Sequence, residues 1–293
     1  MEIAVLIGLG LIVLLVFILR KKPKEMMEKP TILTPEKWKT FLRKQVNFYR
    51  NLNETQKLQF ELDIQRFLEA VRITGVQTEI TLEDRLLVAS SAVIPLFGFP
   101  EWTYNHLDEV ILYPNSFDRN FNIGSTEEII TGMVGNGSME GKMILSKPAL
   151  HVGFDISNDK KNVGIHEFVH LFDKETGSID GVPPGFENKS YVLPWLDFVK
   201  EKTNEIVAKQ SDINDYGATN RQEFLAVTGE YFFERPHLLK KKHPKLYEKL
   251  SQLFNQDMTA IIDPSSFVES THPSRNSPCP CGSGVKYKWC CLE

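Results

Sequence analysis

The amino-acid sequence predicts a mostly helical α+β fold with a small sheet, preceded by one transmembrane helix. Several segments of helical length begin at a capping residue and carry many apolar side chains. Shorter runs rich in Val, Ile and Leu fall in the first half of the chain and indicate strands. An uncharged apolar run extends from Ile3 to Leu19. The chain of 293 residues is long enough for one sizeable domain with appendages.

The N-terminal apolar run has the composition of a membrane span. As a helix it would be about 25 Å long, at the short end of what crosses a bilayer. Four basic residues follow it between Arg20 and Lys24, whereas only Glu2 precedes it, and this order places the bulk of the chain in the cytoplasm. A cleaved signal peptide is the alternative, but its basic residues would precede the apolar run. We expect a retained anchor at residues 1–20 and a basic juxtamembrane linker at residues 21–32.

The expected elements follow from capping residues, turn residues and side-chain patterns. Helices are expected from Thr34, from Asn53 to Gly75, from Asp84 to Leu96, from Asn162 to Gly177, from Leu193 to Gln210, from Asn220 to Glu234 and from Pro244 to Phe254. Strands are expected at Thr78–Leu82, Val110–Tyr113, Lys142–Leu145 and Ala149–Phe154, with a turn at Gly135–Gly137. A small sheet therefore precedes the central helix that Asn162 caps, and one domain covers residues 33–262.

Charge and cysteine usage exclude some classes of function. The formal net charge is −4, so the chain lacks the basic footprint of a nucleic-acid-binding protein, and we expect no direct DNA binding. All four cysteines fall in the last 15 residues, so the main body has no disulfide framework and suits a reducing compartment. The polar segment 263–276 is predicted to be a linker, and residues 277–293 a separate module.

The strongest chemical signal is a His-Glu-x-x-His sequence formed by His166, Glu167 and His170. One helical turn separates the two histidines, so both imidazoles point from the same face. Two imidazoles at this spacing can hold zinc, and Glu167 can take a proton from a water that the metal activates. A pair of core histidines with ordinary hydrogen-bond partners is the alternative. The apolar helix around them requires partners for these polar groups in either case.

A catalytic zinc needs three protein ligands and one open position. The ligand spacing is not that of a metzincin, because Thr176 stands six residues after His170. Glu223 is the better candidate for the third ligand. It lies on a helix that is apolar on nearly every side, where a carboxylate needs a cation as partner. Glu230, two turns later, can replace it or support the site, and a buried salt bridge is the alternative for either. Asp173 shares the helix face of the histidines and fits a role in orienting an imidazole.

The C-terminal module contains a compact thiol cluster: Cys279, Cys281, Cys290 and Cys291. Two pairs at this spacing can close one tetrahedral structural zinc site, with a tight turn at Gly282–Gly284 between them. Two disulfides are the alternative, which a cytoplasmic location disfavours. A module this small has almost no core, so the metal would supply its folding energy.

Four stretches together resemble the Mlc titration factor A family of zinc-dependent peptidases, the glucose-regulated metallopeptidases: His166–Asp173, Asp180–Pro183, Tyr216 and Asn220–Phe233. Thr34–Trp38 and Leu112–Pro114 look similar too, so the likeness extends from about Pro30 to Asp257. It implies a zincin-type core with zinc on His166, His170 and Glu223, and with Glu167 as the catalytic glutamate. It also implies that Tyr216 hydrogen-bonds the developing oxyanion, whereas an ordinary packed aromatic is the alternative for this residue.

The last residues resemble the SEC-C motif, which implies docking to a protein or ribosomal partner. We therefore expect a zinc metallopeptidase with one catalytic and one structural zinc, acting on a peptide or protein substrate. The anchor would hold it at the inner membrane of a bacterium as a single-pass protein, with the catalytic domain facing the cytoplasm. Two alternatives are a regulatory binding protein that sequesters a transcriptional regulator and an adaptor that recruits a partner through the SEC-C tail.

Overall fold

The computed structural model describes residues 34–100, 102–125, 129–175, 177, 179–182, 184 and 189–266. The expected anchor at residues 1–20, the basic linker and the four cysteines lie outside these ranges. Among the helices within them, none is long and apolar enough to cross a membrane. This finding corrects the predicted single-pass location at the inner membrane, which is withdrawn.

A small mixed sheet has the strand order β1-β2-β4-β3. Its strands are β1 (Arg72–Gly75), β2 (Glu109–Tyr113), β3 (Gly132–Val134) and β4 (Lys142–Ser146). The first, second and fourth strands run parallel, and Val110 pairs with Ile73 on one side and Met143 on the other. Strand β3 pairs with β4 in the antiparallel sense and forms an edge of the sheet.

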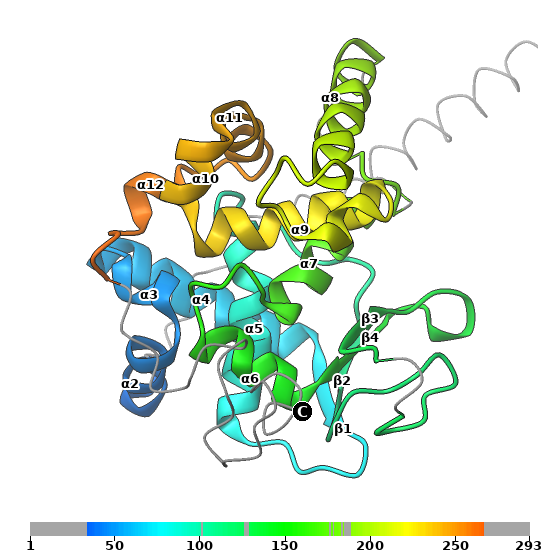
Figure 1. Ribbon diagram of the computed structural model, residues 1–293. Helices are drawn as coiled ribbons and strands as arrows, with labels where there is room; N and C mark the ends of the chain where they lie inside the picture. The colour runs from blue at the N-terminus through cyan, green and yellow to red at the C-terminus, as the bar shows by residue number, and fades with distance from the viewer. Residues whose placement is uncertain are drawn as a thin grey trace, which may run out of the picture. The chain divides into compact units, whose positions relative to one another are not determined.

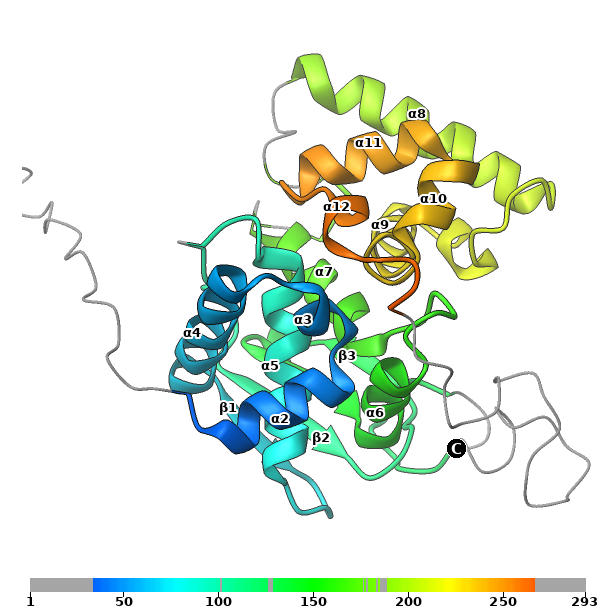
Figure 2. The ribbon, with the colours of Figure 1, turned by 90° about the vertical axis from the view of Figure 1, so that its left-hand side faces the viewer.

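Helices make up most of the described chain, which confirms the mostly helical α+β class. They are α2 (Glu36–Gln45), α3 (Asn47–Asn51), α4 (Glu54–Ala70), α5 (Leu82–Leu96), α6 (Lys147–Asp155), α7 (Val163–Lys174), α8 (Lys189–Val207), α9 (Arg221–Glu234), α10 (Pro236–Lys242), α11 (Pro244–Leu253) and α12 (Met258–Ile261), with 3-10 turns η1 (Gly137–Met139) and η2 (Asp215–Ala218). Helix α7 lies between α5 and α9 (Figure 1), and α10 and α11 pack on the other side of α9 (Figure 2).

Three asparagines begin helices as their sequence context predicts. Asn53 forms a reciprocal capping box with Gln56 at the start of α4. The side chain of Asn162 accepts a hydrogen bond from the backbone of Ile165 in α7, and Asn220 does the same at the start of α9. These caps fix where the two helices of the predicted metal site begin.

Three predicted elements near the sheet are wrong. Thr78–Leu82 is not a strand, because Thr81 caps α5 in a capping box with Asp84. Ala149–Phe154 lies in helix α6, which the side chain of Ser146 caps. The helix expected to reach Gly75 ends at Ala70, and the next four residues form β1.

Helix α7 is buried from Gly164 to Lys174. Phe168 and Phe172 on its apolar side are fully buried, and the ring of Phe168 lies 5.6 Å from that of Phe67 in α4. Full burial of one phenylalanine stabilises the fold by about 2–3 kcal/mol. Packing on this side therefore fixes the helix that carries His166 and His170.

Candidate metal centre

Three side chains from α7 and α9 converge at one point. The Nε2 atom of His166 lies 3.0 Å from Oε2 of Glu223 and 3.2 Å from Nε2 of His170. The Nε2 atom of His170 lies 3.5 Å from the same oxygen of Glu223. Among the described residues, this is the group whose ligand atoms could hold a metal ion, with all three atoms within 4.8 Å of one another.

These three atoms suit a tetrahedral zinc. Zinc bonds of about 2.0–2.1 Å to nitrogen and oxygen give tetrahedral edges of about 3.3 Å. The three separations, 3.0, 3.2 and 3.5 Å, lie on both sides of that value. Two imidazole nitrogens and one carboxylate oxygen are also a ligand set that catalytic zinc sites use. The residues therefore fit zinc, and three such protein ligands would leave a fourth position open.

Glu230 connects the metal site to the start of α7. Its Oε1 atom lies 2.8 Å from Nδ1 of His166, and its Oε2 atom accepts a hydrogen bond of 2.6 Å from the backbone N–H of Asn162. A hydrogen bond on Nδ1 fixes the orientation of the ring and leaves Nε2 directed at the metal position. Glu230 is thus placed behind His166, whereas Glu223 faces both histidines.

The carboxylates around His166 favour a positive charge. Burial alone would lower the pKa of His166, but the charge of Glu230 and hydrogen bonds to Glu223 and Glu230 raise it well above its ordinary value. Burial raises the pKa of Glu223, but hydrogen bonds to His166 and His170 outweigh it and lower the pKa to about 2. The same negative charges that hold a proton here also favour a divalent cation among the three ligand atoms.

Glu167 is buried beside this centre with 5% of its surface exposed. Burial raises its pKa, although the positive charges of His166 and His170 oppose the shift. Strand β3 lies against it: a Cβ atom added to Gly132 would fall 2.5 Å from Oε1 of Glu167 and 2.7 Å from Val163. Only glycine leaves room for the carboxylate at this point of the edge strand.

No local pattern in the sequence singles out Gly132. A three-residue strand has too few positions to show an alternating pattern, and the approach of Gly132 to Glu167 depends on tertiary packing. The turn at Gly135–Gly137 is the one nearby signal in the sequence. A turn just before the expected strand at Lys142–Leu145 indicates that the residues preceding the turn form a strand that pairs with it.

The structure places two further predicted residues near the centre. Tyr216, on η2, is half exposed, and its ring centroid lies 6.0 Å from that of His166. Burial, followed by the charges of Glu223 and Glu167, raises the pKa of Tyr216, so its hydroxyl stays protonated. The carboxylate of Asp173 accepts a hydrogen bond of 2.7 Å from the backbone of Gly181. This hydrogen bond connects Asp173 on α7 to the loop that follows the helix. The predicted role of Asp173 in orienting an imidazole of the site stays a prediction.

Comparison with known proteins agrees with this geometry. Residues 18–255 match the glucose-regulated metallo-peptidase M90 family. The chain belongs to this family. An uncharacterized protein of Synechocystis is 28% identical over 244 residues, which cover 80% of this chain and 87% of the relative. Mlc titration factor A of Yersinia enterocolitica is 26% identical over 235 residues (70% and 86%), and that of Serratia proteamaculans is 24% identical over 197 residues (62% and 73%).

A second match covers the C-terminal end of this M90 family member. Residues 275–293 match the SEC-C motif, which contains all four cysteines and lies outside the described residues. The two matches, a metallopeptidase family and a cysteine motif, are consistent with zinc as the metal.

Proposed function

We propose that this M90 family member is a zinc metallopeptidase that hydrolyses peptide bonds in a peptide or protein substrate. The convergence of His166 Nε2, His170 Nε2 and Glu223 Oε2 within 4.8 Å carries the proposal. Membership of a metallopeptidase family supports it.

Bound zinc would act as a Lewis acid at the open position, where it lowers the pKa of water and polarises a carbonyl group. Glu167 serves as the general base: its carboxylate takes a proton from the attacking water and then passes it to the leaving amine. Burial supports this role because it raises the pKa of Glu167 and so makes the carboxylate a stronger base. Glu230 keeps the imidazole of His166 oriented throughout.

Tyr216 supplies a hydrogen-bond donor to the developing oxyanion. Its half-exposed position beside His166 leaves the ring accessible to a substrate. The raised pKa supports the role, because only the protonated hydroxyl donates.

A second, structural zinc would be bound by Cys279, Cys281, Cys290 and Cys291 of the SEC-C motif. In this proposal the folded motif docks to a protein or ribosomal partner. Deletion of residues 277–293 would then abolish recruitment of that partner and leave peptide hydrolysis intact.

Zinc content of purified proteins tests the ligand assignment. We expect about two zinc ions per wild-type chain, and about one after Glu223→Ala or after deletion of residues 277–293. Peptide hydrolysis should be lost in the Glu223→Ala variant and retained in the deletion. An unchanged zinc content in Glu223→Ala would rule out Glu223 as a ligand.

The names of two relatives favour a second candidate function. Both relatives are called Mlc titration factor A, a name that suggests capture of another molecule, Mlc. We propose as the second candidate that this chain sequesters a transcriptional regulator. If binding is the main function, capture of such a regulator by this chain should survive both Glu167→Gln and removal of the catalytic zinc. Loss of capture in both conditions would contradict this second candidate.

A further inference from the structure

The carboxylate of Asp212 joins separate parts of the chain. Asp212 lies between α8 and η2, in the same segment as Tyr216. Its Oδ2 atom accepts a hydrogen bond of 2.8 Å from the hydroxyl of Tyr231 on α9, and its Oδ1 atom lies 2.8 Å from Nε2 of His243, which precedes α11. The Nζ atom of Lys160, in the loop before α7, lies 3.3 Å from Oδ2. The segment that carries Tyr216 is therefore tied to α9 and to the loop that leads into α7.

Both the side chain and the backbone of Asp212 are held. The Nζ atom of Lys160 also donates a hydrogen bond of 2.5 Å to the backbone oxygen of Asp212. Burial would raise the pKa of Asp212, but the hydrogen bonds that its carboxylate accepts, the largest effect coming from His243, outweigh burial and lower the pKa. The carboxylate is therefore ionised at neutral pH, and its charge strengthens the hydrogen bonds that it accepts.

Short links carry the position of Asp212 to Tyr216. Ile213, the next residue, is buried with 3% of its surface exposed. The side chain of Asn214 then accepts a hydrogen bond of 3.1 Å from the backbone N–H of Tyr216. The side chain of Tyr216 is half exposed, and its ring centroid lies 6.0 Å from that of His166. The place of this ring beside the metal centre is therefore set largely by the backbone that Asp212 anchors.

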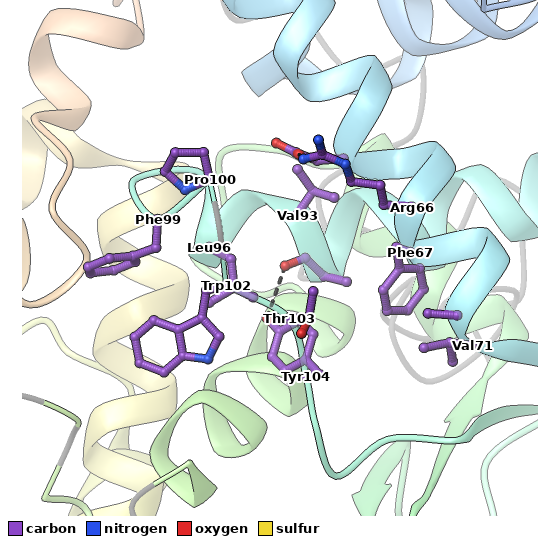
Figure 3. A pocket seen from close by; sticks show the side chains of 13 residues that line it. Arg66, Phe67, Val71, Val93, Leu96, Phe99, Pro100, Trp102, Thr103 and Tyr104 are labelled. Carbon is purple, nitrogen blue, oxygen red and sulfur yellow. Dashed lines mark hydrogen bonds and ion pairs between the residues drawn. The ribbon is translucent and has the colours of Figure 1, made fainter. Parts of the chain in front are cut away.

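Helix α7 is fixed in a different way, by apolar packing. The ring of Phe172 lies 5.2 Å from that of Trp102, and the ring of Phe168 lies 5.1 Å from that of Tyr104. Figure 3 shows Trp102 and Tyr104 on the wall of an apolar cavity of about 100 Å³ beside the end of α5. Because this close packing supports the helix of the two histidines from behind, a change at Asp212 should move η2 before it moves α7.

We propose that Asp212 is a positioning residue that holds the hydroxyl of Tyr216 where the oxyanion develops. The inference rests on the proposed function, because Tyr216 has this role only if the chain hydrolyses peptides. A hydrogen-bond donor stabilises a transition state most when it is in place before the charge develops. A displacement of about 1 Å can reduce the rate about a hundredfold, so an exposed tyrosine on a short 3-10 turn needs an anchor.

A double-mutant cycle in the full chain tests the proposal. Asp212→Asn keeps the size of the side chain but has one acceptor oxygen where the carboxylate has two. We expect kcat for a peptide to fall about tenfold, with KM and zinc content unchanged. In the Tyr216→Phe background Asp212→Asn should cause no further loss, because the hydroxyl that it positions is absent. Asp215→Asn is the matched control: Asp215 is next to Tyr216 but pairs with the exposed Lys209, so kcat should stay at the wild-type value.

A second variant and a second measurement keep the test decisive. Tyr231→Phe removes only the hydroxyl that donates to Asp212, so it should lower kcat in the same way even if Asp212→Asn does not fold. Hydrogen–deuterium exchange needs no peptidase activity, and in both variants it should be about tenfold faster at residues 213–218 and unchanged in α7.

Three results would each overturn the proposal: an unchanged kcat in Asp212→Asn, an equal loss from Asp212→Asn with and without the Tyr216 hydroxyl, or unchanged exchange at residues 213–218. A wild-type protein that hydrolyses no peptide would instead overturn the proposed function. The exchange rates would then still decide whether Asp212 holds the segment that carries Tyr216.

Discussion

The Oε1 atom of Glu230 lies 2.8 Å from Nδ1 of His166, while the other oxygen of the same carboxylate accepts the backbone N–H of Asn162. One side chain of α9 therefore holds both the start of α7 and His166, a proposed metal ligand one helical turn further on. This arrangement makes the orientation of His166 depend on the packing of α7 against α9.

Replacement of Glu230 should weaken zinc binding without unfolding the chain. Glutamine has one carbonyl oxygen, so Glu230→Gln can accept from His166 or from Asn162 but not from both. We expect zinc affinity to fall about tenfold to hundredfold in a competition titration with a chelator. Glu234→Gln is the matched control, because Glu234 accepts the backbone N–H of Lys161 at the same helix start. Equal losses in both variants would show that the effect comes from the helix start alone.

A methyl group at Gly132 should displace Glu167, the general base of the proposed mechanism. The added Cβ atom of Gly132→Ala meets Oε1 of Glu167 at 2.5 Å, so either the carboxylate or strand β3 must move. We expect kcat/KM for a peptide to fall about tenfold to hundredfold while zinc stays bound. Met133→Ala, in the same strand, should have a small effect. Full activity of Gly132→Ala would show that this close approach is not needed for catalysis.

Removal of the Tyr216 hydroxyl should reduce kcat more than it changes KM. In the proposed mechanism the donor acts on charge that develops only in the transition state, so Tyr216→Phe should lower kcat about a hundredfold. Tyr191→Phe on α8 is the control, because Tyr191 is similarly exposed. An unchanged kcat in Tyr216→Phe would show that Tyr216 is an ordinary packed aromatic residue with no role at the oxyanion.

Asp84 should stabilise the fold at neutral pH and lose this effect in acid. It is fully buried and lies 2.9 Å from Nζ of Lys147 and 2.7 Å from Nε2 of His151. Burial would raise the pKa of Asp84, but hydrogen bonds from His151, Lys147 and Thr81 outweigh it and lower the pKa. Because the folded state binds this proton less tightly than the unfolded chain, the contribution is complete above about pH 4 and is lost as the pH falls below it.

Urea unfolding at several pH values checks this expectation. Asp84→Asn should lower the free energy of unfolding by about 2–3 kcal/mol at pH 7, and the gap to wild type should narrow below about pH 4. Asp215→Asn, which removes an exposed ion pair with Lys209, should change it by less than about 1 kcal/mol. A gap that stays constant with pH would contradict the charge-based explanation.

Local signals in the sequence were sufficient to predict the two helices that carry the residues of the candidate metal site. The caps Asn162 and Asn220 and the spacing of His166 and His170 depend on neighbours within one or two turns, so they can be identified without tertiary contacts. Glu223 could be proposed from the apolar helix around it, and the structure brings its carboxylate to both histidines.

The sheet could not be predicted as well, because pairing partners decide strand identity. Arg72–Gly75 forms a strand only through its parallel pairing with β2, and Gly132–Val134 only through β4. The alternating residues after Thr78 instead lead into a helix, because the Thr81–Asp84 capping box is stronger than the strand pattern. The contact of Gly132 with Glu167 arises from this pairing and has no local signature.

The most direct measurement of the central claim is peptide hydrolysis by Glu167→Gln protein whose zinc content is determined in the same preparation. Glutamine keeps the shape of the side chain but cannot accept the proton, so we predict bound zinc and a kcat/KM at least about a hundredfold below wild type. Glu175→Gln, just after α7, should hydrolyse the peptide as wild type does. Hydrolysis at the wild-type rate by zinc-loaded Glu167→Gln protein would contradict the proposed peptidase mechanism.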